Sequence, residues 1–187
     1  MKSLTCLSLV LLVVSCGAPG ANRNAGQPAP VRPKATMVLF SPAFENGQPI
    51  PKKFTGDGQN VSPELVWDSV PEGTRSFALV CSDPDAPIKT FIHWVIYNIP
   101  DTMRRLPEGF PTEPKFPNGI CQGRNGFGGI GYSGPKPPPG KPHRYYFVLY
   151  ALDTVIGMRP GSSAKSIKES TLGRTLAKAE LMGTYGR

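Results

Sequence analysis

Two aspartates and two histidines are the residues of this sequence best suited to chemistry. Asp83 and Asp85 belong to the run Asp83-Pro84-Asp85-Ala86-Pro87, and His93 and His143 are the only histidines in the chain. An imidazole can carry a positive charge near neutral pH, and a carboxylate can hold an imidazole in place by accepting its N–H. Together these residue types are suited to binding a small anion or a metal ion.

Each feature also has a plain structural interpretation. The two prolines fix backbone angles, so the Asp-Pro-Asp run is also typical of a rigid turn. If the run stays extended, its period of two places Asp83 and Asp85 on one side. A single histidine in an apolar strand is more often a hydrogen-bonded core residue than a ligand contact. Spacing alone leaves these alternatives open.

A metal-dependent hydrolase is the main enzymatic alternative. Two aspartates and two histidines could form a mixed oxygen and nitrogen metal site. The sequence has no histidine pair on one helix face of the HExxH kind. We therefore predict no catalytic residues, no metal and no cofactor.

Four apolar runs are expected to form the strands that position these side chains. They are rich in β-branched or aromatic residues and cover residues 37–40, 77–81, 91–99 and 145–152. The 22 prolines and 21 glycines among 187 residues disfavour a helical bundle. The central runs are apolar on both sides, as in strands covered on both faces. We predict a mostly β domain, an antiparallel β-sandwich with a few short peripheral helices.

One of these helices is expected near the C-terminus. Ser166-x-x-Glu169 has the pattern of a capping box. Leu172, Leu176 and Ala179 follow at helical spacing, and Gly183 supplies a stop. The pattern predicts that the helix continues through these residues.

The charge of the chain favours anionic partners. Its 21 basic and 13 acidic residues give a formal net charge of +8 with histidine neutral. The lysines and arginines are scattered through predicted loops and form no long run. No aromatic RNA-recognition signature, zinc-finger spacing or basic helix is present, so we predict no nucleic acid partner.

The N-terminus has the features of a targeting segment. Residues 1–15 read as a signal peptide, with Lys2 before a short apolar stretch. Val13-Val14-Ser15-Cys16 resembles the bacterial lipobox, so we expect acylation of Cys16, with an ordinary secretory signal as the alternative. Residues 16–36 read as the lipidated cysteine and a flexible linker, and residues 37–187 as the folded domain. Since Gly17 follows Cys16, we expect an exported protein anchored in the outer membrane and facing the periplasm.

Two cysteines, Cys81 and Cys121, remain in the predicted domain. An oxidising compartment would allow a disulfide between them. Cys81 could equally be a small buried strand residue, because bridging requires Cα atoms within about 7 Å.

Three ordered motifs resemble those of the phosphatidylethanolamine-binding protein family, in particular its bacterial Raf kinase inhibitor-like branch. They are Asp83-Pro84-Asp85-Ala86-Pro87, His93-Trp94-Val95-Ile96-Tyr97-Asn98-Ile99-Pro100, and Gly131-Tyr132-Ser133-Gly134-Pro135 leading to His143-Arg144-Tyr145. The resemblance implies an antiparallel β-sandwich with a surface pocket for phosphate or phosphorylated head groups. The family's pocket positions fall on Asp83, Asp85, His93, Gly134, His143 and Tyr145.

Three positions depart from the pattern of bacterial relatives. Gly126 stands where Asp is usual, Lys136 where Cys is frequent, and Arg174 where His is common. We expect the surroundings of the pocket to be more basic for this reason. Glycines between Gly128 and Gly134 could also offer backbone N–H groups to an anion.

The predicted function is therefore the binding of small phosphate-containing anions or phospholipid head groups, with modulation of a protein partner as a further role. Family members in eukaryotes inhibit kinases or serine proteases, so an extracytoplasmic protease inhibitor is the first alternative. The metal-dependent hydrolase is the second.

Overall fold

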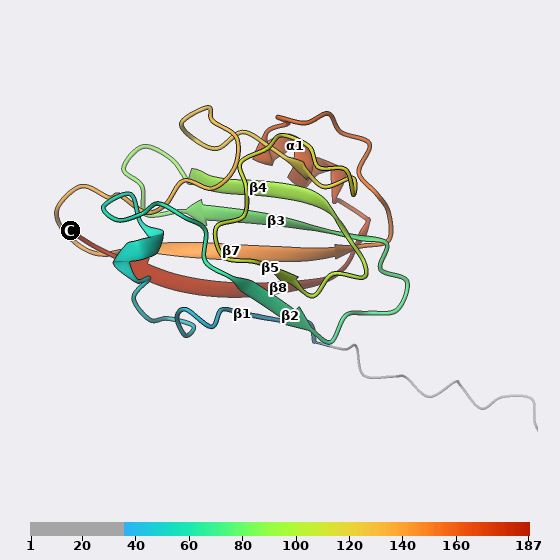
Figure 1. Cartoon of the computed structure of the whole chain (residues 1–187), viewed down its shortest axis with the longest axis horizontal. Helices are drawn as coiled ribbons and strands as arrows, with labels where there is room; N and C mark the ends of the chain where they lie inside the picture. Colours follow the sequence, from blue (N-terminus) through green and yellow to red (C-terminus); the bar gives the residue numbers. More distant parts are fainter. Residues whose placement is uncertain (1–35) are drawn as a thin grey trace, which may run out of the picture. The chain divides into compact units, whose positions relative to one another are not determined.

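The computed structural model describes residues 36–187, so the predicted signal peptide, Cys16 and most of the linker lie outside the described residues. Two antiparallel sheets form the domain (Figure 1). The smaller sheet has the order β1-β2-β5, with β1 at Val38–Phe40, β2 at Leu65–Asp68 and β5 at Arg105–Leu106. The larger has the order β6-β4-β3-β7-β8, with β3 at Ser76–Asp83, β4 at Phe91–Pro100, β6 at Cys121–Gln122, β7 at His143–Leu152 and β8 at Thr175–Tyr185. The predicted antiparallel β-sandwich is confirmed.

Both faces of the larger sheet are covered, which explains why its strands are apolar on both sides. Leu79 and Phe147 point to the smaller sheet and pack in one core cluster with Trp67. Val95 points to the opposite face and packs in a second cluster with Ile167 of helix α1, at Ala164–Ser170. The only other helix in the described part of the chain is a 3-10 turn, η1, at Lys52–Phe54.

The two cysteines of the domain lie in different clusters. Cys81 belongs to the cluster between the sheets, and Cys121 to the cluster under α1. Both are buried free thiols in the structure. The suggested disulfide is therefore not formed here, and burial raises the pKa of the Cys81 thiol well above its usual range.

The helix near the C-terminus is present but shorter than the sequence predicts. Ser163 caps it, because its side chain accepts the N–H of Ser166. The extension of this helix towards Gly183 is wrong, since residues 175–185 form β8. Pairing of β8 along the whole of β7 outweighs the local helical spacing.

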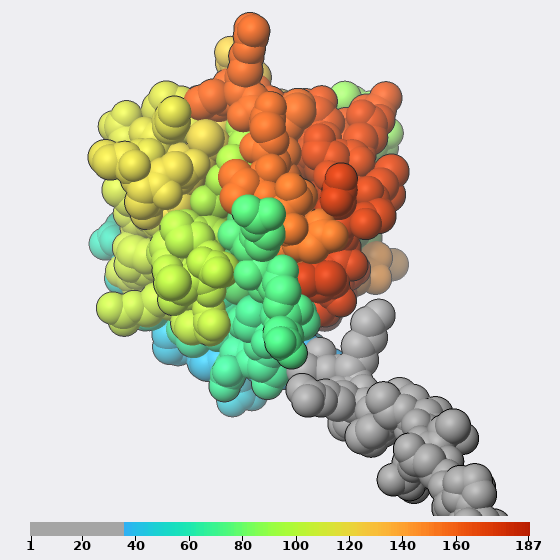
Figure 2. Space-filling view, turned by 90° about the vertical axis from the view of Figure 1, so that its right-hand side faces the viewer, coloured from blue at the N-terminus to red at the C-terminus, as the bar shows by residue number. Residues whose placement is uncertain are grey.

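The antiparallel order brings the ends of distant segments together. β3 ends at Asp83 beside the start of β7 at His143, at the left in Figure 1. The other end of the sheet is closed by the loops that precede β3 and follow β7, shown in green and orange in Figure 2. There the Arg75 N–H donates to the Leu152 carbonyl at 2.8 Å.

No helix among residues 36–187 is long and apolar enough to cross a membrane.

Strand β4 contains two bulges, at which one of its residues has no partner on β3. Phe77 pairs with Ile99 and Ala78 with Tyr97, so Asn98 is the extra residue, with φ 56°. Its side chain holds the loop beyond β7, because the amide accepts the Ile156 N–H at 2.8 Å and donates to the Ile156 carbonyl at 2.9 Å. The second bulge lies at His93 and shapes the site described below.

We expect Asn98→Ala to lower the free energy of unfolding by about 2 to 4 kcal/mol, because it removes two partly buried hydrogen bonds and forces alanine to a positive φ. Asn98→Gly should recover about 1 kcal/mol of this loss, since glycine adopts that φ without strain. Urea denaturation of the three proteins measures the difference. Equal stability of the Ala and Gly variants would contradict the role given to the backbone angle.

Candidate functional site

A cavity of about 160 Å³ opens at the end of the sheet where β3 stops and β7 begins. Its walls come from the ends of β3, β4 and β7 and from three loops, and its lining residues are Asp83, Ala86, Pro87, Phe91, His93, Phe127, Lys136, Pro137, Pro138, His143 and Tyr145. Four of the six predicted pocket residues are among them: Asp83, His93, His143 and Tyr145. Asp85 and Gly134 are not.

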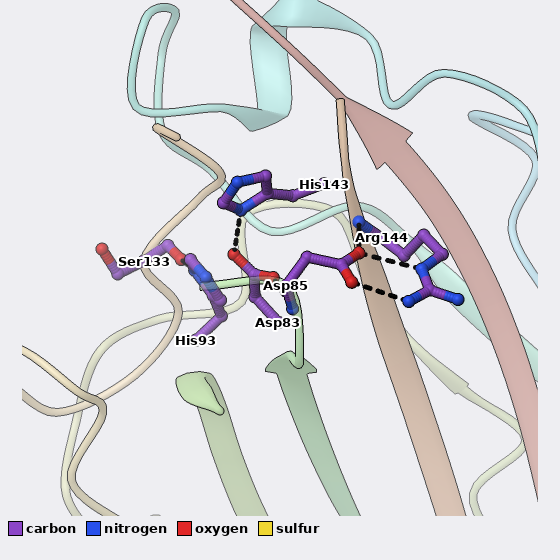
Figure 3. A network of polar contacts seen from close by, with 6 residues as sticks. All are labelled: Asp83, Asp85, His93, Ser133, His143 and Arg144. Carbon is purple, nitrogen blue, oxygen red and sulfur yellow. Dashed lines mark hydrogen bonds and ion pairs between the residues drawn. The ribbon is translucent and has the colours of Figure 1, made fainter. Parts of the chain in front are cut away.

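Asp83 and His143 form a buried pair at the centre of the site (Figure 3). The Asp83 side chain is 5% exposed and that of His143 12%. Nδ1 of His143 lies 2.8 Å from Oδ2 of Asp83. Because an ionised carboxylate can only accept, Nδ1 carries the proton. The carboxylate thereby fixes the ring and leaves its Nε2 for another partner.

His93 faces the cavity because of the second bulge in β4. Cys81 pairs with Trp94 and Ser82 with Ile92, so His93 is the extra residue. Its backbone carbonyl, free of the ladder, accepts the Ser133 N–H at 2.9 Å. Its Nδ1 donates back to the Ser133 carbonyl at 2.5 Å. Burial lowers the pKa of His93, so at neutral pH the ring is uncharged and its Nε2 carries a lone pair.

Figure 3 shows that the Asp85 carboxylate is directed at Arg144, whereas that of Asp83 is directed at His143. The chain turns at Pro84 and Asp85, so of the two alternatives that the sequence left open the rigid turn is the one formed. The Asp85 carboxylate binds Arg144 through both oxygens, at 2.8 Å from Nε and 2.6 Å from Nη2, and also accepts the Arg144 backbone N–H. These bonds lower the pKa of Asp85 to about 2. The pair joins the turn after β3 to the start of β7.

Gly134 lies behind the wall rather than on it. Its N–H donates to Oδ1 of Asn60 at 2.7 Å, so it is not available to a ligand. A Cβ at this position would come within 2.4 Å of the Phe54 carbonyl oxygen. The Ser133 amide is occupied as well, by the His93 carbonyl. Of the backbone donors expected between Gly128 and Gly134, those of Gly128, Gly129, Ser133 and Gly134 are therefore already used.

Among the residues that line the cavity, Tyr145 supplies the one fully buried side-chain polar atom that lacks a partner within residues 36–187. The residue is 1% exposed, and its hydroxyl makes no hydrogen bond there. Burial and the nearby Asp83 carboxylate raise the pKa of Tyr145 well above its usual range, so the hydroxyl keeps its proton. The ring meets that of His93 edge-on, with centroids 5.1 Å apart. A buried unpaired hydroxyl is costly unless a ligand satisfies it.

Sequence reasoning missed the aromatic part of the wall. The rings of Phe91 and Phe127 meet at 4.7 Å, and Phe91 also packs 5.0 Å from His93. A Cβ at Gly126 would lie 2.5 Å from the Phe91 ring, so the Asp usual in relatives would displace this ring. The glycine at position 126, where relatives usually have Asp, is the sequence signal for this wall, because it leaves room for a large ring such as that of Phe91.

Lys136 and Arg174, the two basic residues that depart from the family pattern, lie in different parts of the domain. Lys136 lines the cavity, so it adds positive charge there. Arg174 does not, and the expectation that it makes the pocket more basic is wrong. It precedes β8 at the opposite end of the sheet, where its Nη1 lies 3.9 Å from Asp153. A position that departs from the family pattern therefore need not lie near the cavity.

The metal-dependent hydrolase finds no support in the described part of the chain. Residues 36–187 contain no group of three or more His, Cys, Asp and Glu side chains that could hold a metal ion. Asp85 faces Arg144, and Nδ1 of His93 faces a carbonyl. The four side chains therefore do not converge on one point.

A larger groove of about 700 Å³ lies on the other face of the same strands. Ser82, Ile92 and Tyr146 line it, whereas their neighbours Asp83, His93 and Tyr145 line the cavity. Three lysines and two glutamates border the groove: Lys165, Lys168, Lys178, Glu169 and Glu180.

This arrangement defines a class of protein, an antiparallel β-sandwich with a small cavity, lined by both polar and apolar side chains, at the end of its larger sheet. The model of the family described as phosphatidylethanolamine-binding protein matches residues 40–186. The chain belongs to this family, and the resemblance noted in the sequence is confirmed.

Relatives and solved structures agree with this assignment. A UPF0098 protein of Aquifex aeolicus is 49% identical over 155 residues, which are 82% of this chain and 90% of that protein. The structure of YbcL from Escherichia coli matches with a TM-score of 0.76 at 36% identity. That of the phosphatidylethanolamine-binding protein homolog CT736 from Chlamydia trachomatis matches with 0.75 at 39%. Each match covers 82% of this chain and 99% of the solved one, so the two solved chains consist almost entirely of this domain.

We expect the free energy of unfolding to fall as the pH is lowered from about 6.5, the ordinary pKa of histidine, towards 5. Because the pKa of His93 is lowered in the folded domain, the unfolded chain binds more protons in this window, and acid favours unfolding. Urea denaturation at several pH values in a buffer free of phosphate measures the slope. The slope should be smaller in His93→Gln, and an unchanged slope would assign the effect to another group.

Proposed function

We propose that this chain binds small phosphate-containing anions, including phospholipid head groups, in the cavity lined by Asp83, His93, His143 and Tyr145. The observation that carries the proposal is the Tyr145 hydroxyl, buried without a partner among residues 36–187. It can donate to a phosphate oxygen. Membership of a family described as phosphatidylethanolamine-binding supports this ligand class.

The size of the cavity supports a head group rather than a whole lipid. Its volume of about 160 Å³ equals the space of about five waters. A phosphate with a short substituent fits in such a volume, whereas acyl chains would have to remain outside. The aromatic wall at Phe91 and Phe127 suits the apolar part of such a substituent.

The charged groups of the site favour an anion whose binding is accompanied by uptake of a proton. Lys136 provides a positive charge at the cavity, and the Asp83 carboxylate is hydrogen-bonded to His143. Each histidine has its Nδ1 committed to a partner, so its Nε2 can donate to a phosphate only after the ring takes up a proton. Binding is therefore coupled to proton uptake and becomes tighter as the pH falls towards the histidine range.

The hydroxyl of Tyr145 gives a direct test by phosphorus NMR or calorimetry with inorganic phosphate. Tyr145→Phe should weaken binding by about tenfold, since it removes one hydrogen bond to a charged ligand. Its free energy of unfolding should be equal or higher, because an unpaired buried hydroxyl is removed.

Tyr150→Phe is the matched control, as Tyr150 lies on the same strand but lines the opposite groove. It should leave phosphate binding unchanged. Unchanged affinity in Tyr145→Phe, or no binding by the unaltered domain at any pH from about 5 to 8, would refute the proposal.

We also propose that the domain acts outside the cytoplasm, anchored by acyl chains on Cys16 to the outer membrane and facing the periplasm. The lipobox-like run before Cys16 motivates this location. A palmitate analogue fed to the producing cells should label the full chain, and Cys16→Ala should abolish the label. Label that persists in this variant would remove the claim.

A further inference from the structure

The groove on the opposite face of the larger sheet has a continuous apolar floor. Strand β7 presents Tyr146, Val148 and Tyr150 to this face, because residues two apart on a strand point the same way. Strand pairing places Ser82 beside Tyr146 and Val80 beside Val148. The register therefore puts these five residues on one surface, which forms the floor of the groove of about 700 Å³.

This floor continues the apolar cluster that is buried under α1. Ile92, Tyr150 and Ala164 pack against that cluster and also line the groove. The helix has only seven residues, so it covers part of the sheet face and leaves the rest open. Val80 and Val148 are 8% and 9% exposed, so they lie at the bottom of a hollow and do not form a protruding patch.

The charged side chains that border the groove leave one positive charge without a counter-charge. Lys165 lies 3.9 Å from Glu169 on α1, and Lys178 lies 3.2 Å from Glu180 on β8. Within residues 36–187 the Lys168 ammonium takes part in no ion pair. The groove therefore complements a ligand with a single negative charge.

The hydroxyl of Tyr150 is a second polar group that a ligand can use. It makes no hydrogen bond in the part of the chain that the structure describes. Burial raises the pKa of Tyr150, so the hydroxyl keeps its proton at neutral pH and can donate it to a hydrogen bond.

We propose that this groove is a second ligand site, which binds a small aromatic carboxylate. The apolar part of the ligand lies on Val80 and Val148, and its carboxylate lies at Lys168. The inference is independent of the proposed anion site, because in the described part of the chain no residue lines both the groove and the cavity.

The size and lining of the groove favour a small molecule. Its volume of about 700 Å³ lies within the range of about 300 to 1,000 Å³ of small-molecule sites, which are mostly apolar and have few polar groups. The rings of Tyr146 and Tyr150 stand on either side of Val148 along β7 and suit edge-to-face contact with an aromatic ligand.

A protein partner fits this surface less well. A stable protein interface buries about 800 Å² on each partner and needs close contact over that area. Here a flat surface would meet the long charged side chains of the border before it reached Val80 and Val148. A slender ligand reaches them directly.

The test compares three ligands that have the same apolar body: phenylbutyrate, phenylbutanol and phenylbutylamine. Calorimetry uses the full chain with Cys16→Ala, so that no acyl chain at that position competes for the groove. Phenylbutyrate should bind about fivefold more tightly than phenylbutanol, a factor that one exposed ion pair can supply, and phenylbutylamine should bind most weakly. Equal affinities for the three ligands, or no binding of phenylbutyrate, would overturn the inference.

Lys168→Glu should reverse this order, because it replaces the unpaired positive charge by a negative one. The matched control is Lys115→Glu, which makes the same change of charge at an exposed lysine that lines neither the groove nor the cavity. The control should keep the original order. Reversal in both variants would reduce the effect to net charge, and the inference would fail.

Methyl NMR locates the bound ligand. Phenylbutyrate should shift the resonances of Val80 and Val148 and leave that of Val66, on the smaller sheet, unchanged. Excess inorganic phosphate should not displace it. Displacement by phosphate without a shift at Val148 would place the carboxylate in the cavity and overturn the inference. Phenylbutyrate bound at Val148 in a chain that binds no phosphate would instead refute only the proposed function.

Discussion

The site depends on one buried carboxylate. Asp83 ends a strand inside the domain, where an ionised group needs donors on each oxygen. It finds them in His143 of β7 and in the backbone N–H of Asp85. The first bond orients an imidazole towards the cavity, and the second closes the turn that sends Asp85 to Arg144. The hydrogen bonds that the Asp83 carboxylate requires thereby fix the turn after β3, the start of β7 and the imidazole ring of His143.

The second requirement is an irregularity of the ladder. Strict alternation along β4 would place His93 on the face of Val95, under α1, because the two residues are two apart. The bulge at His93 shifts the alternation by one, so His93 joins Phe91 on the cavity side. It also frees the carbonyl that holds Ser133. One unpaired residue thus aims a side chain and anchors the loop that passes in front of it.

The strands and the residue types of the site could be predicted from the sequence, whereas the contacts between the site residues could not. Apolar runs identified β1, β3, β4 and β7, since burial on both faces requires continuous apolar residues. The C-terminal segment misled because Leu172, Leu176 and Ala179 fit a helical period, while ten long-range pairs with β7 decide the outcome. Residue types also located Asp83, His93 and His143, but not the direction of Asp85. That direction depends on Arg144, a partner whose approach follows from strand pairing rather than from local spacing.

The cavity and the groove lie on opposite faces of the same strand ends, in β3, β4 and β7, and are lined by neighbouring residues of these strands. Point substitutions can therefore alter one lining and leave the other intact, so the two faces are free to diverge separately. A one-residue insertion or deletion near Ser82 is different in kind, because it would exchange the two linings. A length change in these strand ends therefore needs a compensating bulge such as the one at His93, whereas loops and single side chains can vary without one.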